Sequence, residues 1–327
     1  MQTAWQPGCS VAMLQLRARM LANIRIFFAN KAVLEVETPL LGHRIGTDPQ
    51  LAFFSTDYCL PPLQQQLFLQ TSPEFAMKRL LAAGSGSIYQ ICKAFRNGES
   101  GRFHNPEFTM LEWYRVGFTL TQLMDEIAEL IQSLFIAEQI ELSSVQRYSY
   151  QAIFQQYTRL NPLIFSYQEY CAYALNHDFP EAVALCEHDH ALWLDFLFSH
   201  CVQPRLRNDA LYMVSGYPAC QSSLARINAD NPLITDRVEL FIDGVELGNG
   251  FYELTDAIEQ NQRFTNEIAQ RQQKNLPEVL KDDRLIAALE TGLPECSGIA
   301  IGLDRLLMLL SKTASIDEVL SFSIHRA

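Results

Sequence analysis

The sequence has no long hydrophobic run, no closely paired cysteines and little positive charge. Its apolar stretches are too short to span a bilayer, so we expect no membrane protein. The opening residues, MQTAWQPGCS, lack the basic-then-apolar pattern of a signal peptide. The eight cysteines are scattered and none forms a C-x-x-C pair, so reduced thiols in a cytoplasmic protein are expected, rather than a disulfide framework or a zinc site.

The scarcity of positive charge bears on possible partners. Lys and Arg total 25 against 37 Asp and Glu, which gives a net charge of −12. Such a chain is a poor general binder of nucleic acid, because phosphate contacts dominate that affinity, although a local basic cluster can still hold phosphates. Gly and Pro are few, and 48% of the 327 residues are hydrophobic, which predicts an ordered protein with a large core.

Hydrophobic periodicity predicts helices and strands along most of the chain. The expected helices cover residues 10–30, 72–84, 121–138, 256–274 and 303–311, and the expected strands cover 33–38, 67–70, 88–95, 107–113, 238–250 and 298–301. Residues 143–235 are less informative, with short helices expected near 167–176 and 189–201. The strands fall in hairpins among helices and no linker divides them, which predicts one α+β domain over residues 1–327, with an antiparallel sheet flanked by helices.

A polar loop at residues 96–106 separates two predicted strands. Arg96 in this loop suits phosphate, because a guanidinium donates two parallel hydrogen bonds. His104, Phe108 and Glu112 then recur every fourth residue, which places them on one strand face. A phosphate-reaching imidazole, an aromatic ring for adenine and a carboxylate for an ammonium group would follow in that order. The alternatives are a solvated hairpin tip and a half-buried strand with a core phenylalanine.

Two glutamates lie on the two strands of a predicted hairpin, on either side of its turn at Asp243-Gly244. With that turn, Glu246 pairs with Phe241 and Glu239 pairs with Gly248. Glu239 and Glu246 then lie diagonally on one face, within reach of one cation. Two carboxylates near nucleotide phosphates would make a magnesium site, whereas two solvated strand carboxylates are the alternative.

A third glutamate and a glycine-containing turn complete the candidates. Glu253 follows Glu246 by seven residues, so simple alternation sends it to the other face unless a bulge at Gly248 or Gly250 re-aims it. Residues 298–305 then run from a strand into a helix, where glycines allow close approach of a ligand to the backbone. An ordinary strand-to-helix junction is the alternative.

Together these segments resemble the three signature motifs of class II aminoacyl-tRNA synthetases. The motifs are Val33–Pro39 (motif 1), Phe95-Arg96 with His104, Phe108 and Glu112 (motif 2), and Gly298–Arg305 (motif 3). The stretches at 104–114 and 246–253 are similar to the lysine enzymes in particular. The resemblance covers nearly the whole chain and implies the catalytic fold of that class.

The resemblance also implies roles for individual residues. It gives Arg96 and Arg305 catalytic roles, and it places adenine between Phe108 and Arg305. The residues implied for ATP are Arg96, Asn97, His104, Asn105, Phe108, Glu246, Leu247, Gly302 and Arg305. Those implied for a substrate with two amino groups are Ser72, Pro73, Glu74, Glu112, Tyr114, Glu253 and Ala300, and those implied for Mg²⁺ are Glu239 and Glu246. The substrate carboxylate would attack the α-phosphorus with loss of pyrophosphate, and motif 1 would form a homodimer interface.

Three departures from the usual synthetase pattern narrow the range of expected functions. Motif 1 begins near the N-terminus, so we expect no OB-fold anticodon-binding domain before it. Ala300 replaces the middle glycine of motif 3, and Ser72 replaces a usual alanine. All three features resemble truncated paralogues of the lysine enzymes, which attach β-lysine to a lysine of elongation factor P. The resemblance therefore implies lysine or (R)-β-lysine as substrate and elongation factor P as acceptor, without tRNA or membrane.

Other interpretations stay open. Motif 2 normally continues Arg-x-Glu, whereas this chain has Gly98 in that place and Glu99 after it; Glu99 substitutes through a one-residue shift, or backbone groups take over. A tRNA-charging enzyme and a non-catalytic regulator that binds lysine or a nucleotide are the competing functions. The expected lack of an anticodon-binding domain and Ala300 count against the first. The retained arginines and the three glutamates count against the second, which Gly98 favours. Residues 186–190 are either a metal cluster or a solvated helix start.

Overall fold

The computed structural model describes residues 5–207 and 209–327. The chain divides into a terminal unit, Met1–Phe118 with Thr255–Ala327, and a central unit, Thr119–Leu254. A single catalytic domain over residues 1–327 stays a prediction. Residues 1–4, which open the N-terminal stretch that lacks a signal-peptide pattern, lie outside the described part of the chain. Within the described part, no helix combines the length and the apolar character needed to cross a membrane.

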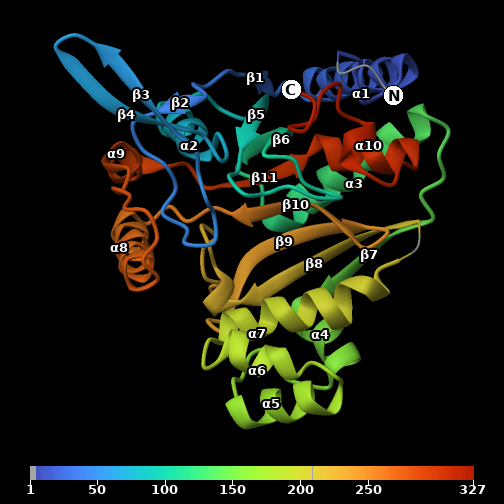
Figure 1. Ribbon diagram of the computed structural model, residues 1–327, viewed down its shortest axis with the longest axis vertical. Coiled ribbons are helices and arrows are strands. Elements are labelled where there is room, and N and C mark those ends of the chain that lie inside the picture. Colours follow the sequence, from blue (N-terminus) through green and yellow to red (C-terminus); the bar gives the residue numbers. More distant parts are fainter. Residues whose placement is uncertain (1–4, 208) are drawn as a thin grey trace. The chain divides into compact units, whose positions relative to one another are not determined.

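Four strands form the sheet of the terminal unit, in the order β1-β5-β6-β11 (Figure 1). Their bounds are Leu34–Glu35 (β1), Ile88–Phe95 (β5), Glu107–Val116 (β6) and Cys296–Gly302 (β11). The pairs β5–β6 and β6–β11 are antiparallel, as predicted, whereas β1 runs parallel to β5. The α+β prediction is therefore confirmed, with a parallel strand at the edge.

Helices and a small second sheet complete the terminal unit. The helices are α1 (Val11–Asn30), α2 (Glu74–Ala82), α8 (Ala257–Gln273), α9 (Asp283–Gly292), α10 (Leu303–Ser311) and the short η4 (Ile316–Glu318). Ser10 caps α1 by accepting from the backbone N–H of Met13, as its position predicts. The second sheet has the order β2-β4-β3, with β2 at Leu41–Gly42, β3 at Ser55–Leu60 and β4 at Leu63–Leu69. In Figure 1 the β3–β4 hairpin extends away from β5 and β6.

The strands of the central unit have the order β10-β9-β8-β7. Their bounds are Ser144–Ser149 (β7), Ala210–Pro218 (β8), Ile234–Ile242 (β9) and Val245–Tyr252 (β10). The helices are α3 (Leu120–Ala137), α4 (Tyr150–Thr158), α5 (Tyr167–Asn176), α6 (Pro180–Cys186), α7 (His190–Leu197), and the short η1 (Phe198–Val202), η2 (Gln203–Arg205) and η3 (Ala219–Gln221). Figure 1 shows α5, α6 and α7 stacked beneath β8. Strands β7 and β8 and helices α4 and α6 were not predicted from the sequence.

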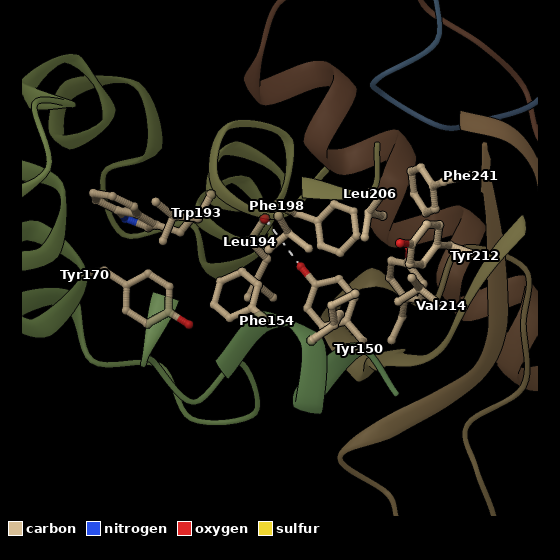
Figure 2. Close-up of a cluster of buried hydrophobic side chains, with 14 of the residues drawn as sticks. Tyr150, Phe154, Tyr170, Trp193, Leu194, Phe198, Leu206, Tyr212, Val214 and Phe241 are labelled. Atoms are coloured by element: carbon tan, nitrogen blue, oxygen red, sulfur yellow. Dashed lines mark hydrogen bonds between the residues drawn. The ribbon is translucent and has the colours of Figure 1, made fainter. Parts of the chain in front are cut away.

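An aromatic cluster joins these helices to β8 and β9 (Figure 2). Trp193 and Tyr150 are at most 1% exposed, and their polar atoms are satisfied. The Trp193 Nε1 donates to the Glu187 carbonyl at 2.9 Å, and the Tyr150 hydroxyl donates to the Leu194 carbonyl at 3.4 Å. Burial of such large rings is a main source of stability for this unit.

The β9–β10 hairpin corrects one predicted register. It turns at Asp243-Gly244 and pairs Glu246 with Phe241, as expected. However, Glu239 pairs with Asn249 rather than with Gly248, because a bulge between Glu246 and Gly248 shifts the register by one residue. The prediction for Gly248 was therefore wrong.

The bulge also decides which side chains share a face. Phe241 and Glu239 are two residues apart on β9, so their partners Glu246 and Asn249 lie on the same face. Glu253 is four residues beyond Asn249 and joins this face by alternation. The bulge thus brings all three glutamates to one face, as the glycines suggested.

Candidate functional site

A candidate phosphate clamp lies where β5 ends and β6 begins. The guanidinium carbon of Arg96 lies 5.1 Å from the ring centre of Phe108, a cation–π geometry. The Nε of Arg96 is buried and has no hydrogen-bond partner. A buried, unused N–H on a cation favours an anionic ligand at this point.

The unusual Gly98 has a structural explanation. Its φ is 81°, a conformation that other residues adopt only with strain. The turn brings the Glu99 carboxylate within 3.8 Å of the Arg96 guanidinium. The preceding residue, Asn97, is held by its backbone N–H, which donates to the Ala52 carbonyl at 3.0 Å. The loop therefore places a glutamate beside Arg96 one residue later than in the usual motif.

The second cation of the clamp, Arg305, lies in the first turn of α10. Its Nη2 donates to the His104 Nε2 at 2.6 Å, and its Nε donates to the Phe103 carbonyl at 3.2 Å. Partial burial lowers the pKa of His104, and the charge of Arg305 lowers it further, so His104 accepts as a neutral ring. His104 lies in the loop before β6 rather than on the strand face.

Two neighbouring residues hold this region together. Asn105 is 6% exposed; its Nδ2 donates to the Glu107 carbonyl, and its Oδ1 accepts from the Ile324 N–H. Asp304, beside Arg305, accepts from the Thr109 backbone N–H at 2.6 Å and so fixes the start of α10 to β6. Gly302 occupies the N-cap position of α10. In this structure the side chain of Asn105 is engaged by the backbone.

Two carboxylate side chains, Glu112 and Glu74, lie farther along β6 and at the start of α2. Glu112 is 2% exposed, and its two oxygens accept from the Ser72 and Tyr114 hydroxyls, each at 2.7 Å. The Ser72 oxygen also accepts from the Glu74 N–H at 3.1 Å. An alanine could make neither bond, so Ser72 orients Glu112 and starts α2. Pro73 occupies the N-cap position, one residue later than predicted.

A buried lysine balances the second carboxylate. Lys78 is 2% exposed and donates to the Glu74 Oε1 at 2.6 Å. The four-residue spacing within α2 is the signal that could have revealed this pair from sequence. The charge of Glu74 is thus already compensated by the protein.

Small residues of β11 lie opposite Glu112 and Tyr114 of β6. In the β6–β11 register Ala300 pairs with Glu112, and Gly298 pairs with Tyr114. Paired residues share a sheet face. A methyl group at Ala300 therefore stands beside Glu112, where a glycine would leave more space.

In the central unit, Glu239 is enclosed by polar side chains. Its Oε1 accepts from Arg237 and its Oε2 accepts from the Tyr217 hydroxyl, each at 2.5 Å. Burial raises the pKa of Glu239; Arg237 lowers it, and the charge of Glu246 raises it. Arg237, also joined to Asn249 at 3.1 Å, was missed from the sequence, although its position two residues before Glu239 puts it on the same face.

Glu239 and Glu246 share one face of the hairpin, and this pair of carboxylates would suit one magnesium ion if phosphates completed the coordination. Glu239 and Glu246 repel each other, so a cation between them would relieve the repulsion. Within residues 5–207 and 209–327 there is no cluster of three or more His, Cys, Asp or Glu that could hold a metal by itself. That result excludes the metal interpretation of residues 186–190 for the described part.

Leu247, at the bulge, is 2% exposed, and Glu253 is 1% exposed.

Comparison with known proteins identifies the family of this chain. The family model for class II tRNA synthetases (D, K and N) matches residues 9–326. Proteins named elongation factor P–(R)-β-lysine ligase are similar over their full length. The relative from Mannheimia succiniciproducens is 43% identical, covering 100% of this chain and 99% of its own. Those from Haemophilus ducreyi and Edwardsiella ictaluri are each 44% identical, covering 99% of this chain and 97% and 98% of theirs. The chain therefore belongs to the class II tRNA synthetase family of the D, K and N type.

Proposed function

We propose that this protein activates (R)-β-lysine with ATP as an acyl-adenylate and transfers the β-lysyl group to a lysine side chain of elongation factor P. The observation that carries the proposal is the full-length similarity to ligases of that name, at 43% and 44% identity. The unused Nε of Arg96 and the buried Ser72–Glu112–Tyr114 group support it from the structure.

The first step needs positioning and charge stabilisation rather than a protein nucleophile. The carboxylate of the amino acid attacks the α-phosphorus of ATP, a C–O–P linkage forms, and pyrophosphate leaves. Arg96 would contact the α-phosphate, and Phe108 would stack on adenine. Arg305, held by His104, would stabilise the charge of the γ-phosphate. Asn97, Asn105, Leu247 and Gly302 would border the nucleotide through their backbones.

Glu239 and Glu246 would hold Mg²⁺ together with the phosphates, and the ion would neutralise phosphate charge. Burial raises the pKa of Glu239, and Arg237 acts against this rise, which favours the ionised form that a metal ligand requires.

The second step joins the acyl group to the acceptor. The neutral side-chain amine of elongation factor P attacks the carbonyl carbon of the adenylate, and AMP leaves with the bonding electrons. The nitrogen releases one proton to water as the amide forms. Glu74, Glu112 and Glu253 would hold the ammonium groups of the substrate, and Ser72, Pro73, Tyr114 and Ala300 would shape its place. Carboxylates left unpaired by an uncharged analogue would reject it.

The intact mass of elongation factor P tests the proposal directly. The acceptor is incubated with the protein, ATP, magnesium and (R)-β-lysine, with α-lysine in a parallel reaction and Arg96→Ala as control variant. We expect a gain of one β-lysyl unit, larger than the gain with α-lysine and absent with the variant. Amino-acid-dependent pyrophosphate exchange without any gain in mass would instead favour tRNA or another acceptor, and neither signal would favour the regulator.

We further propose a homodimer through motif 1. Motif 1 and its neighbours in sequence carry exposed apolar side chains: Ile26 of α1 (58%), Leu34 of motif 1 (55%) and Leu41 of β2 (45%). Such residues are common at subunit interfaces. Sedimentation should give twice the 37.2 kDa chain mass, and Leu34→Glu should shift the protein toward the monomer.

For the compartment we propose the cytoplasm, where translation takes place. The eight cysteines are all free, which suits a reducing environment. The net charge of −12 supports a protein acceptor over tRNA.

A further inference from the structure

The carboxylate of Glu239 is held by an arginine whose three nitrogens are all engaged. The Nη2 of Arg237 donates to the Glu239 Oε1 at 2.5 Å. Its Nε donates to the Asn249 Oδ1 at 3.1 Å, and its Nη1 donates to the backbone carbonyl of Gln221 at 2.6 Å. These partners lie on β9, β10 and η3. Because a guanidinium is planar, three contacts in different directions fix its orientation.

Gln221 connects this arginine to helix α7. The residue ends the short η3 turn and is 9% exposed. Its side-chain Nε2 donates to the Asp195 Oδ1 at 2.6 Å, a bond between segments that are 26 residues apart in sequence. A continuous series of hydrogen bonds therefore runs from Asp195 on α7 through Gln221 and Arg237 to Glu239 on β9.

The contacts of Glu239 set its direction and leave it able to bind a cation. Its Oε2 accepts from the Tyr217 hydroxyl at 2.5 Å, while Oε1 accepts from Arg237. A carboxylate offers roughly four acceptor sites, so these two bonds leave acceptor capacity on both oxygens. Magnesium demands a nearly ideal octahedral geometry, and the direction of a ligand carboxylate therefore affects how tightly the ion is held.

We propose that Asp195 and Gln221 are positioning residues for the magnesium ligand Glu239. The inference rests on the proposed function and deepens it. Asp195 holds the Gln221 side chain, the Gln221 carbonyl orients Arg237, and Arg237 orients the Glu239 carboxylate. Groups that orient a metal ligand in this way contribute roughly 10- to 100-fold to metal affinity.

The competing explanation is that the bond between Asp195 and Gln221 only stabilises the fold. The buried face of α7 is supplied by Trp193, Leu194 and Leu197, whereas Asp195 retains contact with solvent. Truncation of Asp195 should therefore leave the aromatic cluster in place. Effects on folding and effects on the metal site can then be separated.

Calorimetric titration of the full-length protein with α,β-methylene-ATP, which cannot release pyrophosphate, measures the effect directly. Each variant is titrated in excess Mg²⁺ and in EDTA, and the ratio of the two affinities gives the gain due to the ion. We expect Asp195→Ala to reduce this gain about tenfold, the lower end of the range because Asp195 acts through two other residues. Its affinity in EDTA should stay near that of the wild type.

Two further variants serve as controls. Asp195→Asn keeps an acceptor for the Gln221 amide and should retain the gain from Mg²⁺. Glu169→Ala truncates another exposed carboxylate, on α5, and should behave as the wild type.

Gln221→Leu tests the same bond from its other side, because it removes the side-chain donor and keeps the backbone carbonyl. It should reduce the gain from Mg²⁺ as much as Asp195→Ala does. The double variant should lose no more than either single variant, since both remove one interaction. Losses that add would mean that the two residues act independently, and would overturn the inference.

The remaining outcomes separate the inference from the proposed function. An unchanged gain in Asp195→Ala, or an equal loss of affinity in Mg²⁺ and in EDTA, would overturn the inference and leave the proposed function in place. A loss in Asp195→Asn as large as in Asp195→Ala would assign the effect to charge and would also overturn it. If Mg²⁺ gave the wild type no gain, the proposed magnesium site would fail together with the inference.

Discussion

The phosphate clamp of the terminal unit and the aromatic cluster of the central unit use polar groups in opposite ways. In the aromatic cluster, Trp193 and Tyr150 place their polar atoms on backbone carbonyls and bury the rest. In the clamp, the Nε of Arg96 is buried with no partner, next to a partly exposed Phe108 ring. The unused N–H of Arg96 therefore distinguishes the clamp from the aromatic cluster, in which Trp193 and Tyr150 are satisfied.

The largest expected effect tests the clamp. Arg96→Ala should reduce kcat/KM for pyrophosphate exchange by about 10³-fold or more, since an arginine on a transferring phosphoryl group contributes that much. The unfolding temperature should stay close to that of the wild type, because the variant also removes a buried donor without a partner. A large loss of stability together with intact exchange would reverse the assignment.

The opposite outcome is expected for the aromatic cluster. Trp193 is fully buried, so Trp193→Ala should lower the free energy of unfolding by about 3–5 kcal/mol. At a temperature where the variant is folded, its exchange rate per folded molecule should remain near the wild-type value. Urea unfolding and exchange on the same sample make the measurement. If activity per folded molecule fell as much as in Arg96→Ala, the contrast between the regions would fail.

The same contrast explains what could be predicted from the sequence. Hairpin strands and long amphipathic helices were predictable because their periodicity is regular, and the motifs pointed to Arg96, Glu112 and Arg305. The bulge after Glu246 was only partly predictable, since glycines permit a bulge without fixing its register.

The helices between β7 and β8 were harder for another reason. The helices expected near 167–176 and 189–201 are confirmed by α5 and α7, whereas α4 and α6 were not predicted. These helices are short, and their apolar residues pack into one shared cluster, so no single stripe stands out.

A variant that removes a charge in the central unit tests the same comparison, with an expected effect of intermediate size. Glu253 is 1% exposed, and the proposed role places it near an ammonium group of the substrate. Glu253→Gln should raise the KM for (R)-β-lysine about 10- to 100-fold and leave the KM for ATP within a few-fold. Kinetics in which both constants rise equally would contradict a role in amino-acid recognition.

The smallest expected effect concerns the methyl group of Ala300. Ala300 pairs with Glu112 across β6 and β11, so its methyl group occupies space beside a carboxylate whose two oxygens are held by Ser72 and Tyr114. Removing one methyl enlarges the site without altering its charges, and a single methylene-sized change is worth about 1–3 kcal/mol in discrimination. Ala300→Gly should therefore shift the ratio of kcat/KM values toward α-lysine by roughly tenfold. The ratio is measured by competition of the two isomers in one reaction, which cancels differences in the active fraction of enzyme.

Ser72→Ala is the informative companion, because it frees one oxygen of Glu112 without enlarging the β11 side. If Ser72→Ala changes the ratio and Ala300→Gly does not, hydrogen bonding to Glu112 rather than space determines which isomer is preferred.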